Sequence, residues 1–421
     1  MLDINRIEND LEHIKVQLKK RNKDYSEELN QVLNFNSDRK KIIKEVEELK
    51  ATKNSISKEI GILAKDKKFD EIEKLKSEVT TMNEKIEVLD KNLKEVQLNM
   101  NSLLAVIPNV PNDNIPLGND DEDNVEVRRW VEPGIKNDGE AHWDIGQKLG
   151  LVDFELGAKL SGSRFLVYKN EGSKMIRAIA DVLLNRHKKH GYQEMFLPLL
   201  VNAENMFGTG QLPKFEEDAY KIDDQYLIPT SEVPLTNVFR NTIVDVKELP
   251  TYLTSFTQCF RREAGSAGRD TKGMIRLHQF NKVEMVKVCE PESSYEELEK
   301  MVLDAEDCLK MFNIPYRVVE LCSGDIGFTS QKTYDLEVWF PNQNKFREIS
   351  SCSNCGDYQA RRMGAKYKNT DGKVNYLNTL NGSGLAIDRL FAAMLENHYD
   401  GEKLILPEVL RPYFDNKEYI K

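Results

Sequence analysis

Apolar residues in the first hundred positions recur every three or four residues, which is the spacing of one face of an α-helix. From Ile72 to Leu103 the spacing alternates between three and four without a break, as in the contact face of a coiled coil. The run from Ile42 to Leu63 has the same rhythm, with Lys53 as its one polar member. Only the short polar stretch 64–71 separates the two runs, so we expect an antiparallel two-helix hairpin.

The periodic pattern is compatible with two arrangements. One is a dimerising coiled coil between two chains, and the other is an intramolecular arm, which the short connection favours. Asn36 and Ser37 are the candidate capping residues at the start of the first helix. A two-helix rod has no room for a catalytic pocket, but it suits binding to an extended partner. Its lysines could contact phosphates. A solvated helix face of mixed charge explains these lysines equally well. These lysines are Lys50, Lys53, Lys65, Lys67, Lys68, Lys74 and Lys76.

The chain changes character after this arm. Residues 104–125 carry three prolines and an acidic cluster, which predicts a surface linker between an arm at 1–103 and a mixed α and β domain at 126–421. In that domain, residues 174–190 form an amphipathic pattern that Gly191 ends, and a strand ending at Pro198 is expected next. The two histidines in the last turn of this helix are typical of favourable charge placement at a helix end more than of a metal site.

Composition narrows the classes of protein. In this chain of 421 residues no apolar run approaches the roughly 20 residues of a membrane span, so no membrane association is expected. The acidic amino end, MLDINRIEND, lacks the features of a leader, and the six scattered cysteines favour a reducing compartment, so we expect the cytoplasm. Cys352 and Cys355 form a single CxxC, for which structural use is favoured over a metal or redox role. A net charge of -10 argues against indiscriminate binding to nucleic acids, although a selective RNA partner remains possible.

Candidate chemistry is concentrated in residues 260–284, where two strand-like segments flank a loop rich in Gly and Arg. Strand alternation predicts one side carrying Arg276, His278, Phe280, Lys282 and Glu284, and a shared side for Arg261 and Glu263. Guanidinium groups suit phosphate oxygens and Phe suits a purine face, so a nucleoside triphosphate is the expected ligand. A charged ladder without a ligand is the alternative. The loop glycines Gly265, Gly268 and Gly273 would let it close.

Three further segments contain suitable side chains for the same site. The stretch 228–232, IPTSE, carries a hydroxyl and a carboxylate. In 347–355, Glu348 lies near Ser350 and Ser351, oxygen ligands of the kind that Mg²⁺ accepts; Glu348 and Ser351 have opposite parity and can converge only at a bulge or a strand end. In 380–397 a Gly-rich turn is expected to lead into a helix with Arg389 about two turns in. The common phosphate-binding Gly motifs of parallel-sheet folds are absent.

Together these segments resemble the three signature motifs of class II aminoacyl-tRNA synthetases, and among those the bacterial-type seryl-tRNA synthetases. The helix and strand ending at Pro198 resemble motif 1, FRREAGSAGRDTKGMIRLHQF resembles motif 2, and NGSGLAIDRL resembles motif 3. The resemblance covers essentially the whole chain. It implies an α+β fold in which an antiparallel β-sheet catalytic domain with flanking helices follows an antiparallel coiled-coil arm.

The resemblance also implies roles at the ATP site. Arg261 would hold the α-phosphate, Glu263 would contact the adenine end, Phe280 and Arg389 would sandwich the adenine, and Arg276 would reach the outer phosphates. The catalytic set would be Arg261, Glu263, Arg276 and Arg389. The full set implied for ATP is Arg261, Arg262, Glu263, Arg276, Phe280, Glu348, Ile349, Ser350, Ser351 and Arg389.

For the other ligands, the resemblance implies that Glu348 and Ser351 bind Mg²⁺. Glu232 would lie near the serine ammonium, and Glu284 or Ser383 would contact the hydroxyl. The serine site would comprise Thr230, Ser231, Glu232, Glu284, Asn381 and Ser383. Asp388 replaces a residue that is usually small in relatives, and we expect it to point away along its helix.

The implied function is activation of L-serine with ATP and transfer of the seryl group to tRNA(Ser), and to tRNA(Sec) where present. The family also implies a homodimer with motif 1 at the interface and an arm that reaches tRNA on the partner subunit. Two alternatives remain. A synthetase-like binding protein would lack the reaction, although the intact arginines and carboxylates count against it. An enzyme activating serine for another carrier is discouraged by the arm.

Overall fold

The computed structural model describes residues 1–131, 139–264 and 272–421. The chain divides into two compact units. One comprises Leu2–Lys19 and Lys23–Pro108, and the other comprises Met1, Lys20–Asn22 and Asn109–Lys421. We call the first the arm unit and the second the catalytic unit.

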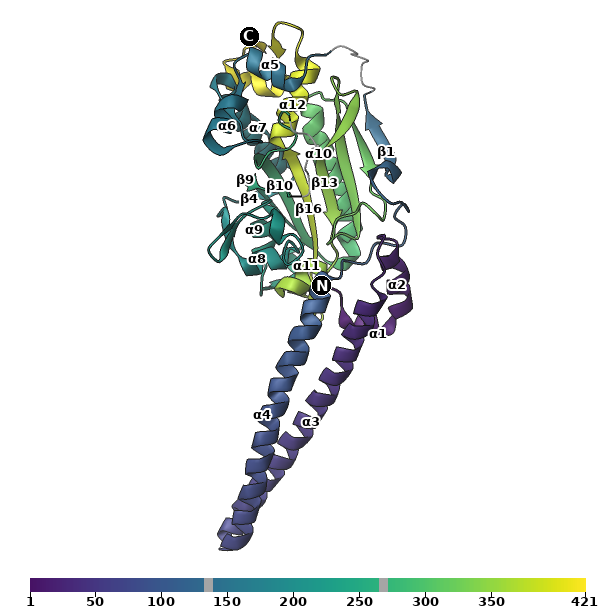
Figure 1. The fold of residues 1–421 in the computed structure, drawn as a ribbon, viewed down its shortest axis with the longest axis vertical. Coiled ribbons are helices and arrows are strands. Elements are labelled where there is room, and N and C mark those ends of the chain that lie inside the picture. The colour runs from purple at the N-terminus through teal and green to yellow at the C-terminus, as the bar shows by residue number, and fades with distance from the viewer. Residues whose placement is uncertain (132–138, 265–271) are drawn as a thin grey trace. The chain divides into compact units, whose positions relative to one another are not determined.

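The arm unit consists of four helices, of which two are long. They are α1 (Ile4–Asn9), α2 (Leu11–Lys19), α3 (Ser26–Lys65) and α4 (Phe69–Val106). In Figure 1, α3 and α4 run antiparallel beside each other, and Glu45 and Lys85 form an ion pair of 2.8 Å between them. Every residue of the predicted seam is buried or half-buried, including Lys53. The predicted intramolecular hairpin is therefore confirmed.

The predicted start of the first long helix was wrong. Helix α3 begins at Ser26, ten residues before Asn36. The Asn36 side chain is buried and donates a hydrogen bond of 2.7 Å to Glu8 Oε1 in the short α1. Its polar group thus stabilises a contact between helices and does not cap one.

The catalytic unit is built on an eight-stranded sheet with the order β1-β11-β12-β13-β16-β10-β9-β4. All neighbours are antiparallel except β4 and β9, which are parallel. This confirms the predicted α+β class with an antiparallel sheet (Figure 1). The strands are β1 (Val125–Trp130), β4 (Gln193–Glu194), β9 (Thr251–Phe260), β10 (Gln279–Cys289), β11 (Tyr316–Glu320), β12 (Lys332–Phe340), β13 (Lys345–Asn354) and β16 (Asn378–Ala386).

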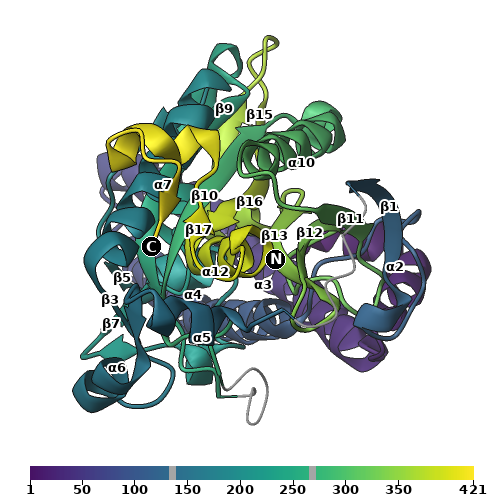
Figure 2. The same ribbon diagram turned by 90° about the horizontal axis from the view of Figure 1, so that it is seen from above.

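Helices α7, α10 and α12 pack on this sheet and complete the main core. Helix α10 contacts β13 and β16, whereas α12 contacts β10 and β12 (Figure 2). Buried side chains such as Met175, Met285, Met301 and Leu390 form one continuous cluster with the strands. The helices of the unit are α5 (His142–Lys148), α6 (Phe154–Ser161), α7 (Asn170–Lys189), α8 (Ala203–Gly208), α9 (Glu232–Asn237), α10 (Ser294–Met311), α11 (Tyr358–Met363) and α12 (Ile387–His398).

Short strands form the remaining sheets: β2 (Val152–Asp153), β3 (Val167–Tyr168), β5 (Leu200–Asn202), β6 (Lys221–Ile222), β7 (Gln225–Leu227), β8 (Ile243–Asp245), β14 (Lys366–Lys368), β15 (Val374–Tyr376), β17 (Leu404–Ile405) and β18 (Tyr419–Ile420). The prediction of a strand that ends at Pro198 was wrong in its extent, because only the two residues of β4 pair with β9. The residues after β4 leave the sheet, and Phe196 is 97% exposed.

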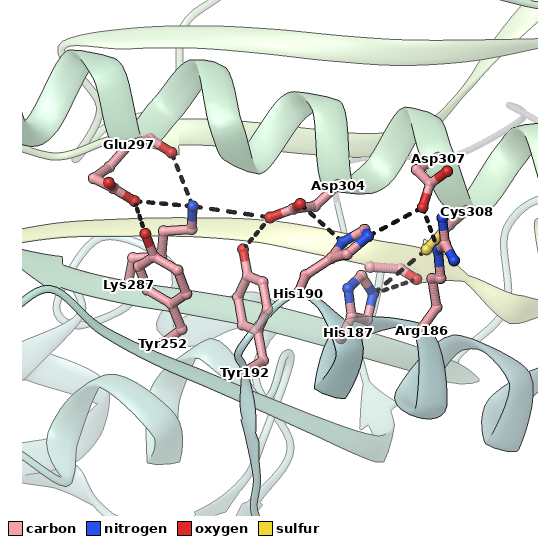
Figure 3. A network of polar contacts seen from close by, with 11 residues as sticks. Arg186, His187, His190, Tyr192, Tyr252, Lys287, Glu297, Asp304, Asp307 and Cys308 are labelled. Atoms are coloured by element: carbon pink, nitrogen blue, oxygen red, sulfur yellow. Dashed lines mark hydrogen bonds and ion pairs between the residues drawn. The ribbon is translucent and has the colours of Figure 1, made fainter.

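A network of polar contacts joins three elements of the catalytic unit (Figure 3). The fully buried Lys287 of β10 lies 3.0 Å from Glu297 and 3.8 Å from Asp304, both on α10. Asp304 in turn contacts His190, after α7, at 2.8 Å. Ion pairing and helix-end placement therefore explain this histidine. In the described ranges no cluster of three or more metal-ligating side chains occurs, and no helix is long and apolar enough to cross a membrane.

Candidate active site

The hairpin of β9 and β10 positions the centre of the site. Phe260, the last residue of β9, pairs with Gln279, the first residue of β10. The loop ends therefore carry Arg261, Glu263 and Arg276. The prediction that side chains alternate between two faces from Arg276 onward was wrong for Arg276 and His278 and holds only from Phe280. Glu263 adopts a left-handed backbone with φ of 54°, which aims its side chain differently from a strand residue.

The loop between these ends is described only in part. Gly265 and Gly268 lie outside the described residues. Gly273 has a φ of 82°, and a Cβ there would lie 2.2 Å from the ring of His142. This glycine is therefore required for close packing of the loop end, in addition to any freedom it gives the loop.

Two adjoining cavities surround the loop ends. The larger has a volume of about 590 Å³ and the smaller about 60 Å³, and Arg261, Glu263 and Arg276 line both. Of the predicted residues, the larger cavity also contacts Thr230, Glu232 and Asn381. The smaller also contacts Phe280, Glu348, Ile349, Ser383 and Arg389. The structure thus brings together residues from all four predicted segments.

Five predicted residues do not line these cavities. Ser231, Ser350 and Glu284 are buried, Ser351 is half-buried on β13, and Arg262 is exposed with its guanidinium over the ring of Tyr220. Ser350 donates a hydrogen bond of 2.6 Å to the carbonyl of Ser383, so it supports the neighbouring strand.

The arginines are fixed by specific contacts. The Arg276 guanidinium lies 2.6 Å from the Glu263 carboxylate, and the Arg261 guanidinium lies 5.1 Å from the centroid of the Phe280 ring. Arg389 donates hydrogen bonds to the carbonyls of Ile275 and Glu348, at 3.0 and 2.6 Å. Three guanidinium groups beside an aromatic ring make a site suited to a phosphorylated aromatic ligand.

A bulge in β13 resolves the opposite parity of Glu348 and Ser351. Leu336 of β12 pairs with Ser350 and Glu337 pairs with Glu348, so Ile349 is the extra residue. One extra residue reverses the alternation, and Glu348 and Ser351 therefore lie on the same face. Asp335, which pairs with Ser351, was missed by the sequence analysis. Burial and the nearby Glu348 charge raise its pKa well above the usual value.

The expectations for the third motif were partly wrong. The Gly-rich stretch continues strand β16 and is not a turn, and α12 begins at Ile387, which puts Arg389 in the first turn. Asp388 does not point away along its helix. It is buried and accepts hydrogen bonds from the backbone N–H of Asn281, at 2.5 Å, and from the Tyr168 hydroxyl. It ties the start of α12 to β10 because a buried carboxylate needs donors.

Two carboxylates and a lysine lie at the other end of the site. Glu232 Oε1 accepts a hydrogen bond of 2.7 Å from Gln359, and Lys282 Nζ lies 2.5 Å from Glu284 and 2.9 Å from Thr230 Oγ1. Burial, with the Glu284 charge, raises the pKa of Glu232 to about 7. Burial also raises the pKa of Glu284, against the opposing effect of Lys282. The sequence analysis placed Lys282 on the right face without a role and missed Gln359, for which no local signal exists.

Comparison with known proteins identifies the family. The model of the tRNA synthetase class II core domain (G, H, P, S and T) matches residues 214–398, and that of the seryl-tRNA synthetase N-terminal domain matches residues 1–111. The chain is 61% identical to the serine–tRNA ligase of Mesoplasma florum over the full length of both.

Solved structures agree. Seryl-tRNA synthetase from Pyrococcus horikoshii complexed with ATP superposes with a TM-score of 0.91 at 34% identity, covering 100% of this chain and 99% of that one. Cytoplasmic serine–tRNA ligase from Naegleria fowleri in complex with AMP gives 0.88 at 29% identity, with the same coverage. The chain therefore belongs to the seryl-tRNA synthetase family of class II aminoacyl-tRNA synthetases.

Proposed function

We propose that this protein activates L-serine with ATP and transfers the seryl group to the 3′ end of tRNA(Ser), and of tRNA(Sec) where present. The observation that carries the proposal is a pair of adjoining cavities lined by guanidinium groups and Phe280, with Glu232 in the wall of the larger cavity and Glu284 paired with Lys282 of the smaller one. Family membership supports the same reaction. A cytoplasmic location is consistent with the transfer of the seryl group to tRNA.

In the first step, a carboxylate oxygen of serine attacks the α-phosphorus of ATP, and the bond to pyrophosphate breaks. Arg261 and Arg276 would stabilise the negative charge that develops on the phosphates, an effect worth several kcal/mol in a preorganised site. Phe280 offers a flat surface for the adenine. Arg261 lies over Phe280, so it would contact both the base and the phosphates, while Arg389 would border the same pocket.

At the serine end, Glu232 would bind the ammonium group and Glu284 would accept a hydrogen bond from the substrate hydroxyl. Asn381 and Ser383, on β16, would complete the wall. In the second step, a hydroxyl of the terminal ribose of tRNA attacks the seryl carbonyl carbon, and AMP leaves. No covalent bond to the protein is needed, because positioning supplies the catalysis.

The same site fits Mg²⁺. The bulge at Ile349 puts the Glu348 carboxylate and the Ser351 hydroxyl on one face, and both are hard oxygen ligands. Bound Mg²⁺ would neutralise charge on the phosphates of ATP. Glu348 also lies 3.5 Å from Arg389, so its orientation is already restrained.

We further propose that the protein is a homodimer. The side chain of Phe196, which follows the motif 1 helix α7, is almost fully exposed, and membership of the family supports an interface at this motif. A cavity lined by Phe165, Leu166, Ile176 and Phe256 lies beside α6, β3, α7, β9 and β10. A second copy of the chain would cover this face.

Serine-dependent exchange of pyrophosphate into ATP tests the first step. We expect exchange with serine and much less with alanine, because a buried acceptor left without its donor disfavours the analogue by roughly 10⁴-fold. A well-folded protein without exchange would instead support a synthetase-like binding protein.

An arm truncation tests the carrier. Because Glu45 and Lys85 face each other, replacing residues 46–84 with a short Gly-Ser linker joins the two helices at a matched level and removes the lysines at positions 50–76. We expect exchange within about twofold of the full-length protein and charging of tRNA(Ser) reduced by about 100-fold or more, since those lysines supply phosphate contacts. Unchanged charging would contradict the role of the arm.

A further inference from the structure

Lys282 is a buried cation that lines the smaller cavity and contacts Glu284 and Thr230 of the proposed serine site. It lies two residues before Glu284 on β10, so both side chains point to the same face of the strand. The Nζ atom lies 2.5 Å from Glu284 and donates a hydrogen bond of 2.9 Å to Thr230. Both Lys282 and Glu284 are almost completely shielded from solvent. The reaction described above does not use this lysine.

Thr230 connects the two carboxylates through its hydroxyl. Its oxygen accepts hydrogen bonds from Lys282 and, at 3.1 Å, from the backbone amide of Glu232. The Thr230 hydroxyl also donates toward Glu284, and this contact, like Lys282, lowers the pKa of that carboxyl against the effect of burial. Lys282 therefore restrains Glu284 directly and the start of α9, which carries Glu232, through Thr230.

The charged groups around this point come from several elements. Two carboxylates, Glu232 and Glu284, face two cations, Lys282 and Arg261. The thiols of Cys259 and Cys355 also adjoin the group, and burial raises the pKa of both, so they stay neutral. Arg261 is directed toward Phe280 and the phosphate end. Lys282 is thus the cation in direct contact with Glu284.

We propose that Lys282 is a positioning residue that assigns different tasks to the two carboxylates of the serine site. By pairing with Glu284, it keeps that carboxylate ionised and fixed as an acceptor for the substrate hydroxyl. Glu232 is then left as the counter-charge for the substrate ammonium. This inference rests on the proposed function and extends it to selectivity.

The assignment has a consequence for substrate choice. An ionised carboxylate can only accept hydrogen bonds, so it demands a donor and favours serine over alanine. Without Lys282, a buried Glu284 takes up a proton, or it competes with Glu232 for the ammonium. Either change weakens serine binding and reduces the preference over alanine.

The test measures pyrophosphate exchange with the full-length wild-type protein, K282M, E284Q and the double variant K282M/E284Q. We expect K282M to raise the KM for serine by about 30-fold, because a charged hydrogen-bonded partner is lost, with the KM for ATP changed less than about threefold. The ratio of serine to alanine exchange should fall.

The double variant keeps the test valid if K282M fails to fold, because E284Q removes the carboxylate that K282M leaves without its lysine partner. If Lys282 acts through Glu284, adding K282M to E284Q changes the serine KM by less than about threefold. A further loss of tenfold or more, or a parallel rise in both KM values, would overturn the proposal. A wild-type protein without serine-dependent exchange would instead overturn the proposed function itself.

Discussion

The guanidinium of Arg276 and the carboxylate of Glu263 form an ion pair of 2.6 Å, although 13 positions of a loop separate the two residues. Both side chains line the two cavities of the site. The pair joins the end of β9 to the segment before β10 and fixes the direction of Arg276. Its charge can therefore be directed at a ligand without a large reorganisation.

The first prediction concerns this arginine. We expect Arg276→Ala to reduce serine-dependent exchange by about 100-fold, because one preorganised cation at the phosphates is lost. Arg276→Lys should restore little, since an ammonium group cannot reproduce the planar fork of donors. The matched control is Arg6→Ala, at an exposed arginine of the arm unit, which should leave exchange unchanged. Full activity of R276A would contradict the assignment.

The second prediction concerns pH. Because the pKa of Glu232 is raised to about 7, this carboxyl is ionised above that pH and protonated below it. The substrate ammonium keeps its charge throughout this range, so kcat/KM for serine should fall by up to tenfold for each pH unit below about 7. The kcat/KM for ATP at saturating serine should stay level. If kcat/KM for serine instead falls only near the ordinary pKa of a carboxyl group, Glu232 is not the group that controls serine binding.

The third prediction concerns the metal. Glu348→Gln should raise the Mg²⁺ concentration needed for half-maximal exchange by about tenfold or more, because a neutral amide is a weaker ligand for a hard cation. The measurement is exchange across a Mg²⁺ titration at fixed ATP. Glu126→Gln, on the edge strand β1, removes a carboxylate of similar exposure and should leave the titration unchanged. Equal curves for both variants would exclude Glu348 as a ligand.

The fourth prediction concerns the buried network of Figure 3. Lys287→Met removes the cation between Glu297 and Asp304, so the free energy of unfolding should fall by roughly 3 to 5 kcal/mol. Tyr192→Phe removes one hydrogen bond to Asp304 and should cost only about 1 kcal/mol. Denaturant titration followed by a probe in the catalytic unit measures both. If Lys287→Met and Tyr192→Phe lower the free energy of unfolding equally, the two carboxylates do not depend on the charge of Lys287.

The fifth prediction concerns assembly. Phe196→Asp places a charge in the proposed interface and should convert a dimer into a monomer in sedimentation experiments, since burying an unpaired charge is unfavourable. Phe69→Asp, at another exposed phenylalanine on the arm, serves as the control and should leave the dimer intact. A wild-type protein that sediments as a monomer would refute the proposed dimer.

Local patterns in the sequence were sufficient to predict much of the structure of this protein. The spacing of three and four residues predicted the two long helices, because a helical face depends only on residues close in sequence. The motif residues predicted a nucleotide site for the same reason, since each motif is one short segment. Where a contact between distant segments decided the outcome, the predictions were wrong. Asn36 does not cap a helix because its side chain contacts Glu8, and Asp388 is buried because Asn281 and Tyr168 supply donors.

The sequence by itself therefore determined the arm, the kind of fold and the chemical character of the site. Only the tertiary structure decided how the side chains divide the work. The pairing of β12 with β13 creates the bulge that puts Glu348 beside Ser351, and the packing of α9 against β10 brings Thr230 to Lys282. Strand register and helix packing depend on partners far away in the chain, and no local spacing encodes them.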